Sequence, residues 1–529
     1  MKQKKWFGIL AAVLALALAL AGCQSGTSPS GSLSASGSES QSLEYVELEY
    51  YLAEKEPTDG AMVWDAINEY LTEKINAKVN IHWIEYADYN QRMAAITGAG
   101  QTLDLMFTST ANFNFPSNAH NGAFLALDEL LPEYAPELME ELPEYVLEGG
   151  RVDGKIYAIP SYKDVADVFA LIWNDTLAQE IGMDEEQLSA SWTYYPDLDG
   201  LLRSFKKLRD EKYPEDASIP LMTAYDTMGA WWSWDQIVGG VCTNVGGIEY
   251  FQDQGSGEKV FNAYATPEYL EIVKQIRVWV EDGILPVANS NFDPDGALNR
   301  AGKVPFKMGN GLVAIPEDYY SKDWVAKLNR SEVAVSYTNY LQAAATAVSQ
   351  NSPNPERSVM FLNIMYTDTY VATTSRFGLE GEHYKLVKDS AGNDRADFSE
   401  GRNSDPNNRG FYFWYGYQWG NLFKTILPLD QPDNLYDELM EMNNDAGQYE
   451  TNLGFVFDQE PVANEIAACA SVYDEFAKPL MQGAFENVES TVAEFNQKLE
   501  ANSIQKIIDE AQKQLNEWRA ANGKSAYEG

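Results

Sequence analysis

Strands and helices alternate over the first structured stretch of the chain, and this alternation limits the possible folds more than any other sequence feature. Val46–Tyr51 and Val79–Ile84 have the composition and spacing of strands. A short helix is predicted over Tyr89–Ile96, and a third strand over Leu103–Phe107. Between the first two strands, apolar residues recur at helical spacing: Val63, Ile67, Tyr70, Leu71 and Ile75. This order predicts a parallel βαβ-type sheet in an α/β fold.

The carboxyl end of the third predicted strand is the first candidate for ligand contact. In parallel sheets, ligands bind beyond the carboxyl ends of the strands. The segment that follows the strand here is Thr108–Asn112. Ser109 offers a hydroxyl and Asn112 an amide, and we predict that both bind ligand.

The N-terminus predicts export. Three lysines within the first five residues precede an apolar run, Trp6–Leu20, which is shorter than the ~20 residues that a membrane-spanning helix needs. A basic start, a short apolar middle and a small-residue end predict a secretory signal peptide over residues 1–22. The run ends in Leu-Ala-Gly-Cys, which resembles a bacterial lipobox. This resemblance implies that Cys23 is diacylated, with palmitate among the acyl groups, and becomes the mature N-terminus.

A flexible linker separates the predicted anchor from the body of the protein. Residues 23–42 are almost entirely Ser, Gly, Thr, Ala and Gln, and such segments behave as slack tethers. Acyl chains supply membrane affinity at ~0.8 kcal/mol per buried methylene. We therefore expect a globular body from Leu43 onward on the extracellular face of the cell membrane, held there by the lipid anchor alone.

Size, charge and cysteine content set further bounds. Nearly five hundred residues follow the linker, which predicts two domains or more. The net charge of −41 is spread along the chain and argues against a nucleic-acid partner. Cys242 and Cys469 are the cysteines of the body. They could pair in an exported protein, although two separate buried thiols are the favoured interpretation.

Several motifs in a fixed order resemble one protein family. These motifs are Gly122–Asp128, Asp153–Pro160, Leu171–Asp175, Asn354–Asn363, Phe377–Tyr384 and Ile507–Trp518. Together they resemble the extracellular solute-binding proteins of ABC transporters, family 1, the relatives of maltose-binding protein. The last two motifs resemble the Gram-positive lipoprotein branch of that family.

The resemblance implies a type II periplasmic-binding-protein-like fold. Two α/β lobes would enclose a ligand cleft, with several crossovers between them and closure by a hinge motion. We expect residues 43–165 plus about 335–400 in the first lobe. We expect residues 166–334 plus about 401–500 in the second, followed by a C-terminal helix over 501–529.

Aromatic clusters indicate a carbohydrate ligand. Sugars present flat C–H faces ringed by hydroxyls, so aromatic platforms beside carboxylates and amides suit them. Three such clusters occur, at 231–235, 318–320 and 411–421. Alternate residues of any strand face the core, so only some members are candidates. The predicted ligand-binding residues of these clusters are Trp232, Trp234, Asp318, Tyr319, Tyr320, Trp414 and Tyr417. The resemblance adds Asp167, the carboxylate a few residues before Asn174.

Catalytic and metal-binding patterns are not found in the sequence. His82, His120 and His383 lack metal-ligand spacing, and no nucleophile elbow, P-loop or dinucleotide fingerprint occurs. Asp293–Gly296 lacks the later ligands of a calcium loop and favours a tight turn. Glu380 and His383 could line a cleft, but local bridging is favoured. We therefore expect no catalytic residues, no metal and no cofactor.

The combined prediction is a lipid-anchored substrate-binding protein of an ABC importer. It would capture an oligosaccharide as a monomer and deliver it to permease subunits. Three alternatives remain open: binding of a peptide or amino-acid derivative by the same fold, a surface polysaccharide-degrading enzyme, and a sensor subunit.

Overall fold

The computed structural model describes most of the chain after the predicted linker. Residues 44–529 form one compact unit, and every contact discussed below lies within it. The described residues are 43–166, 169–183, 185–188, 195–222, 234–244, 257–288, 293, 296–310, 326–330, 336–406, 408–413, 418–446 and 452–528.

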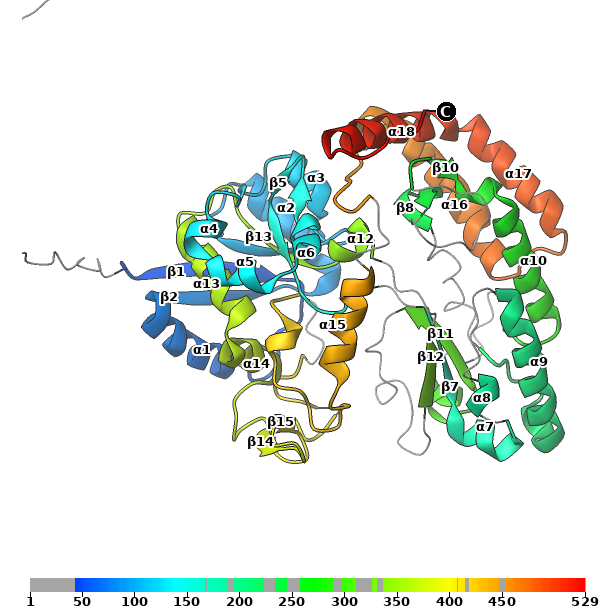
Figure 1. The fold of residues 1–529 in the computed structure, drawn as a ribbon, viewed down its shortest axis with the longest axis horizontal. Helices are drawn as coiled ribbons and strands as arrows, with labels where there is room; N and C mark the ends of the chain where they lie inside the picture. Colours follow the sequence, from blue (N-terminus) through cyan, green and yellow to red (C-terminus); the bar gives the residue numbers. More distant parts are fainter. Residues whose placement is uncertain are drawn as a thin grey trace, which may run out of the picture. The chain divides into compact units, whose positions relative to one another are not determined.

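A five-stranded sheet organises the first hydrophobic core (Figure 1). Its strands, in spatial order, are β2 (Ala77–Trp83), β1 (Val46–Leu52), β3 (Leu105–Thr108), β13 (Ala345–Val348) and β6 (Ala158–Pro160). β1 pairs in parallel with β2 and β3, as the sequence predicts. β13 and β6 were not predicted as members of this sheet; β13 runs antiparallel to both of its neighbours, so the sheet is mixed.

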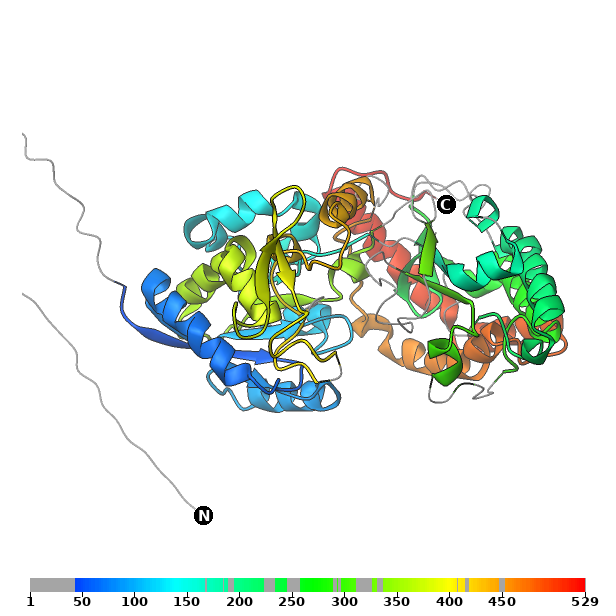
Figure 2. The same ribbon diagram turned by 90° about the horizontal axis from the view of Figure 1, so that it is seen from below.

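Helices cover this sheet and supply the rest of the first core. The predicted stripe of α1 is buried at Val63, Ile67, Leu71 and Ile75, and the helix packs on β2 (Figure 2). The helices of this part are α1 (Gly60–Ile75), α2 (Tyr86–Gly98), α3 (Phe115–His120), α4 (Leu131–Tyr134), α5 (Pro136–Glu141), α6 (Glu144–Glu148), α12 (Thr338–Leu341), α13 (Pro355–Thr367) and α14 (Thr369–Phe377). β4 (Arg151–Val152) and β5 (Lys155–Ile156) form a small hairpin, with Gly154 at positive φ in its turn.

Two small antiparallel sheets contribute to the second hydrophobic core. In one, β7 (Phe169–Asn174) lies between β11 (Phe306–Asn310) and β12 (Ala326–Arg330). In the other, β9 (Val241–Asn244) lies between β8 (Trp234–Val238) and β10 (Phe261–Asn262).

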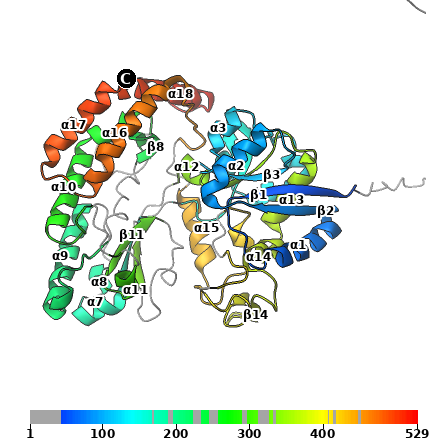
Figure 3. The same ribbon diagram turned by 180° about the vertical axis from the view of Figure 1, so that it is seen from behind.

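Long helices enclose this second core, and α10 packs against α17 and α16 (Figure 3). Thr266 caps α10 by accepting a hydrogen bond from the Tyr269 amide, and Pro267 occupies the first turn. Cys242 and Cys469 are both buried and free. The helices of this part are α7 (Asp175–Ile181), α8 (Glu185–Leu188), α9 (Tyr195–Lys212), α10 (Pro267–Glu281), α11 (Ala297–Arg300), α16 (Ala463–Met481), α17 (Val488–Ala501) and α18 (Ile504–Ala521).

The chain passes between the two cores more than once. Val165 belongs to the first core and Leu171 to the second, and later Phe306 belongs to the second and Leu341 to the first. Leu453 packs in the first core, whereas Phe455, two residues on, packs in the second. This connectivity makes each core discontinuous in sequence.

The expected lobe boundary near residue 400 differs from the structure. Phe411 and Trp419 pack in the first core instead of the second. Leu422 and Leu435 pack with Ala166 in a third, smaller cluster. This region also contains the hairpin of β14 (Lys385–Lys388) and β15 (Asp394–Asp397), and α15 (Leu435–Ala446). The predicted C-terminal helix forms as α18, with its apolar stripe buried in the second core.

Within the described residues, helices long enough to cross a bilayer lack the apolar character to do so.

Candidate functional site

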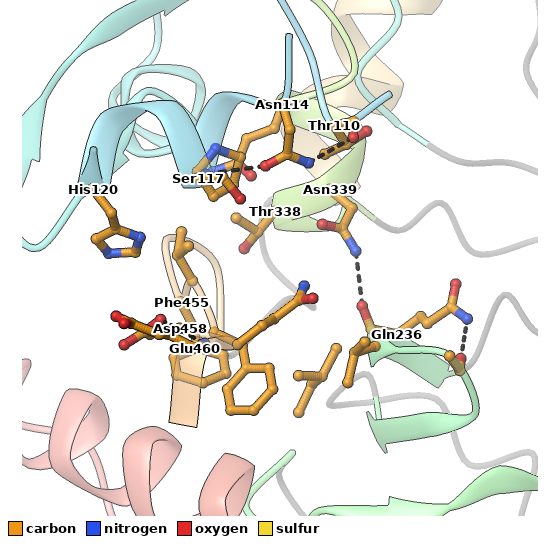
Figure 4. A pocket seen from close by; sticks show the side chains of 18 of the residues that line it. Thr110, Asn114, Ser117, His120, Gln236, Thr338, Asn339, Phe455, Asp458 and Glu460 are labelled. Atoms are coloured by element: carbon orange, nitrogen blue, oxygen red, sulfur yellow. Dashed lines mark hydrogen bonds between the residues drawn. The ribbon is translucent and has the colours of Figure 1, made fainter. Parts of the chain in front are cut away.

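A pocket of about 700 Å³ is lined by residues from four separate parts of the chain (Figure 4). Its described lining residues are Thr110, Asn114, Pro116, Ser117, His120, Asn121, Asp235, Gln236, Ile237, Val238, Gly239, Thr338, Asn339, Gln342, Phe455, Val456, Phe457, Asp458, Gln459, Glu460 and Ala463. Amide, hydroxyl and carboxyl groups make up much of this lining. It therefore offers hydrogen-bond donors and acceptors at several points of its wall.

The first wall follows the end of β3, where the sequence predicts ligand contact. Ser109 and Asn112 do not line the pocket; both are buried, and they shape the turn. The Ser109 hydroxyl accepts hydrogen bonds from the amides of Ala111 (3.1 Å) and Asn112 (2.7 Å). Their neighbours Thr110 and Asn114 reach the pocket instead.

Both polar atoms of the Asn114 side-chain amide form hydrogen bonds that hold this wall in place. Its Oδ1 accepts from the Ser117 amide at 3.0 Å and caps α3, and its Nδ2 donates to the Thr110 carbonyl at 2.8 Å. The Ser117 hydroxyl and the His120 imidazole follow along α3 (Figure 4). The imidazole Nε2 of His120 lies 3.2 Å from the Asp153 carboxylate.

The second wall is β8, and Trp234, one of the predicted ligand-binding residues, is not among the residues that line the pocket. Trp234 is 3% exposed and lies in the second core, where its ring meets Phe261 edge-on. The next residue, Asp235, lines the pocket, as do the four residues that follow it. Burial raises the pKa of the Asp235 carboxyl to about 7.

The third wall is α12 with the residue that follows it. Asn339 Nδ2 donates to the Gln236 carbonyl at 2.7 Å, which joins α12 to β8 (Figure 4). Gln342 is 1% exposed, and its carbonyl accepts from the Thr110 amide at 3.0 Å. Among the described residues, its side-chain Nε2 has no hydrogen-bond partner. A buried donor of this kind costs stability in the free protein.

The fourth wall, Phe455–Glu460, belongs to the C-terminal part of the chain. Phe455 and Phe457 pack in the second core and present apolar surface to the pocket. The backbone of Asp458 is held by Gln514 on α18, whose Oε1 accepts from the Asp458 amide at 2.9 Å and whose Nε2 donates to its carbonyl at 3.0 Å. This segment is thus fixed through its main chain.

The other predicted ligand-binding residues fall outside the described part of the chain. These are Asp167, Trp232, Asp318, Tyr319, Tyr320, Trp414 and Tyr417, and the predicted lipidation site Cys23 also falls outside it. They stay predictions. Within the described residues, no group of three or more acidic, histidine or cysteine side chains is arranged to hold a metal ion.

His383 has a local structural environment away from the pocket, in line with the favoured interpretation. Its side chain is fully buried, its Nδ1 accepts from the Leu379 amide at 3.0 Å, and its Nε2 lies 3.3 Å from Asp59. Burial lowers the pKa of His383, although the Asp59 carboxylate opposes that shift. Arg402 donates two hydrogen bonds of 2.6 Å to the same carboxylate and lowers the pKa of Asp59.

Sequence reasoning missed most of the pocket. Gln342 and the Phe455–Glu460 wall have no local signal, because contacts between residues hundreds of positions apart bring them to the site.

Comparison with known proteins matches two family models. The model of the bacterial extracellular solute-binding protein family matches residues 55–372, and a domain of unknown function (DUF3502) matches residues 451–520. A carbohydrate ABC transporter substrate-binding protein of Streptococcus pneumoniae serotype 4 is 26% identical over 460 residues, which cover 85% of this chain and 86% of that protein.

Solved structures show the same fold. The N-glycan transport solute binding protein of Streptococcus pneumoniae is 23% identical, with a TM-score of 0.74 over 90% of this chain and all of that one. Its complex with Man1GlcNAc has a TM-score of 0.67 at 21% identity, over 89% and 99% of the two chains. The fold class expected from the sequence is confirmed by these neighbours.

Proposed function

We propose that this chain, which belongs to the bacterial extracellular solute-binding protein family, captures an oligosaccharide and delivers it to an ABC importer. Members of this family bind solutes and are not enzymes, so the predicted class of protein is confirmed. The sugar ligand and the importer are supported by the relative described as a carbohydrate ABC transporter substrate-binding protein.

One observation carries the proposal: the pocket has a polar lining and draws its walls from both cores. Thr110 and Asn114 come from the part that contains the first core, and Asp235 and Phe455 from the part that contains the second. Hydroxyl-rich ligands need many donors and acceptors on their rims and apolar surface against their ring faces. A ligand seated here would contact both cores and favour their closed arrangement.

Ligand-induced stabilisation tests this proposal. We expect the body from Leu43 onward to melt at a higher temperature with an oligosaccharide present, because a ligand at a hundred times its dissociation constant adds ~2.7 kcal/mol. Thermal unfolding would be followed against panels of neutral oligosaccharides, peptides and amino acids, with recovery of the ligand checked by mass spectrometry. Shifts with peptides alone would contradict an oligosaccharide cargo, and a chemically altered sugar would contradict pure binding.

The membrane attachment is a separate part of the proposal. The lipobox-like Leu20–Cys23 supports diacylation of Cys23. We further expect the protein to act as a monomer beside permease subunits at the extracellular face. We expect Cys23→Ala to lose labelled palmitate and to leave the membrane fraction for the medium, while Ser25→Ala keeps both. If the Cys23→Ala protein stayed in the membrane fraction, the proposed lipid anchor would be contradicted.

A further inference from the structure

The charged side chains of the described pocket lining are nearly all acidic. Asp235, Asp458 and Glu460 line it, and the described lining contains no lysine or arginine. His120 is the single basic side chain in that lining, and its imidazole already faces the carboxylate of Asp153 at 3.2 Å. The described lining therefore gives an anionic ligand no strong cationic partner.

Two buried polar groups indicate what the pocket does accept. Gln342 lines the pocket and is 1% exposed, and its buried Nε2 lacks a hydrogen-bond partner among the described residues. A rotation of this side chain would bring the donor to an acceptor oxygen of the ligand. Asp235 is 6% exposed, so its carboxyl is poorly solvated. A sugar hydroxyl, which both donates and accepts, suits these two groups together.

We propose that the pocket selects uncharged oligosaccharides over anionic ones, with Asp458 and Glu460 as the selectivity-determining side chains. This inference rests on the proposed function and narrows its substrate class. Both carboxylates stand on the fourth wall, across the pocket from the first wall on α3 (Figure 4). A carboxylated or sialylated sugar would bring like charge against them, which weakens binding and slows the encounter.

The geometry of the fourth wall makes the idea testable without disturbing the fold. Gln514 holds Asp458 through main-chain atoms, and Asp458 Oδ1 accepts from the Glu460 amide at 3.0 Å. Asparagine at 458 keeps that acceptor oxygen. Asp458→Asn with Glu460→Gln thus removes two charges while keeping shape and hydrogen bonding.

The experiment compares matched neutral and anionic glycans. The probes are oligosaccharides of mannose and N-acetylglucosamine, together with the same glycans ending in a carboxylated sugar, titrated by calorimetry at low and at high salt. Each glycan is titrated into the wild-type body, into the Asp458→Asn/Glu460→Gln variant and into a control. The control is Asp509→Asn/Glu517→Gln, which removes two exposed charges of α18 outside the pocket lining.

We expect anionic glycans to bind the wild type at least about tenfold more weakly than their neutral partners. The ratio of the dissociation constant of the anionic glycan to that of the neutral glycan should fall toward one in the Asp458→Asn/Glu460→Gln variant and at high salt. In the control variant this ratio should stay at the wild-type value. Equal binding of both glycans to the wild type, or an unchanged ratio in the variant, would overturn the inference while leaving oligosaccharide capture in place. Binding of neither glycan would overturn the proposed function as well.

Discussion

Gln342→Leu is expected to weaken oligosaccharide binding by one to two orders of magnitude without lowering the melting temperature of the free protein. The amide Nε2 of Gln342 is buried and unpartnered among the described residues, so the free protein loses no bond when it is removed. The bound ligand, however, loses a buried hydrogen-bond donor, at a cost of ~1–3 kcal/mol. Calorimetric titration and thermal unfolding of the same variant measure the two effects separately.

Asn68→Leu is the matched control for this prediction. Asn68 is a buried amide like Gln342, but its Nδ2 donates to the Val79 carbonyl at 3.0 Å and its Oδ1 accepts from the Val79 amide at 2.7 Å. Its replacement leaves two backbone groups unpaired and should lower stability by ~2 kcal/mol or more, with ligand affinity retained. If Gln342→Leu behaved in the same way, Gln342 would be a structural residue and not a ligand contact.

Asp59→Asn should destabilise the protein by ~2 kcal/mol, because the buried Asp59 carboxylate pairs with Arg402 and faces His383. Its carboxylate accepts two hydrogen bonds from Arg402 and faces the buried His383, and its amide donates to the Gly410 carbonyl at 3.0 Å. Half of the Arg402 side chain is exposed, so water partly compensates that cation when the charge of Asp59 is removed. Thermal unfolding of both proteins at pH 7 measures the difference.

The pH dependence of this difference has a definite sign. Hydrogen bonding to Arg402 lowers the pKa of Asp59 in the folded protein. The stabilisation that the ionised Asp59 carboxylate provides is therefore complete at any pH above its pKa in the unfolded chain, which is about 4. This stabilisation is lost only as the pH falls through the lower pKa that Asp59 has in the folded protein. The gap between Asp59→Asn and wild type should thus persist down to about pH 4 and shrink below it. Asp282→Asn, which breaks the exposed pair with Arg203, should cost less than ~1 kcal/mol. A gap that closed between pH 7 and 5 would contradict the role of the Asp59 carboxylate.

Much of the fold could be predicted because local patterns were strong. The stripe of α1 and the Thr266-Pro267 start of α10 both follow from short-range chemistry. Asn354 shows the limit of such rules, since its side chain does not cap α13 although Pro355 stands at the first position of the helix. β13 was missed because Ala345–Val348 is short and buried on both faces, so it lacks the alternation that identifies a half-buried strand.

The site was predictable only in part, for a different reason. The turn after β3 was found, because strand ends in parallel sheets are general ligand sites, yet its pocket-facing residues are Thr110 and Asn114 and not Ser109 or Asn112. Aromatic content points to Trp234, which is buried in the second core, whereas its neighbour Asp235 lines the pocket. Gln342 becomes notable only when its burial is known, and burial is a property of the whole fold.

The way in which Gln514 supports the fourth wall has an evolutionary consequence. The Gln514 side chain forms hydrogen bonds with the main-chain amide and carbonyl of Asp458. Every residue other than proline has both of these groups. Natural selection can therefore exchange the side chains of this wall among paralogues while the scaffold beneath is kept. Divergence at positions 458 to 460, with Gln514 retained, would let one ancestral receptor give rise to descendants that take up different nutrients.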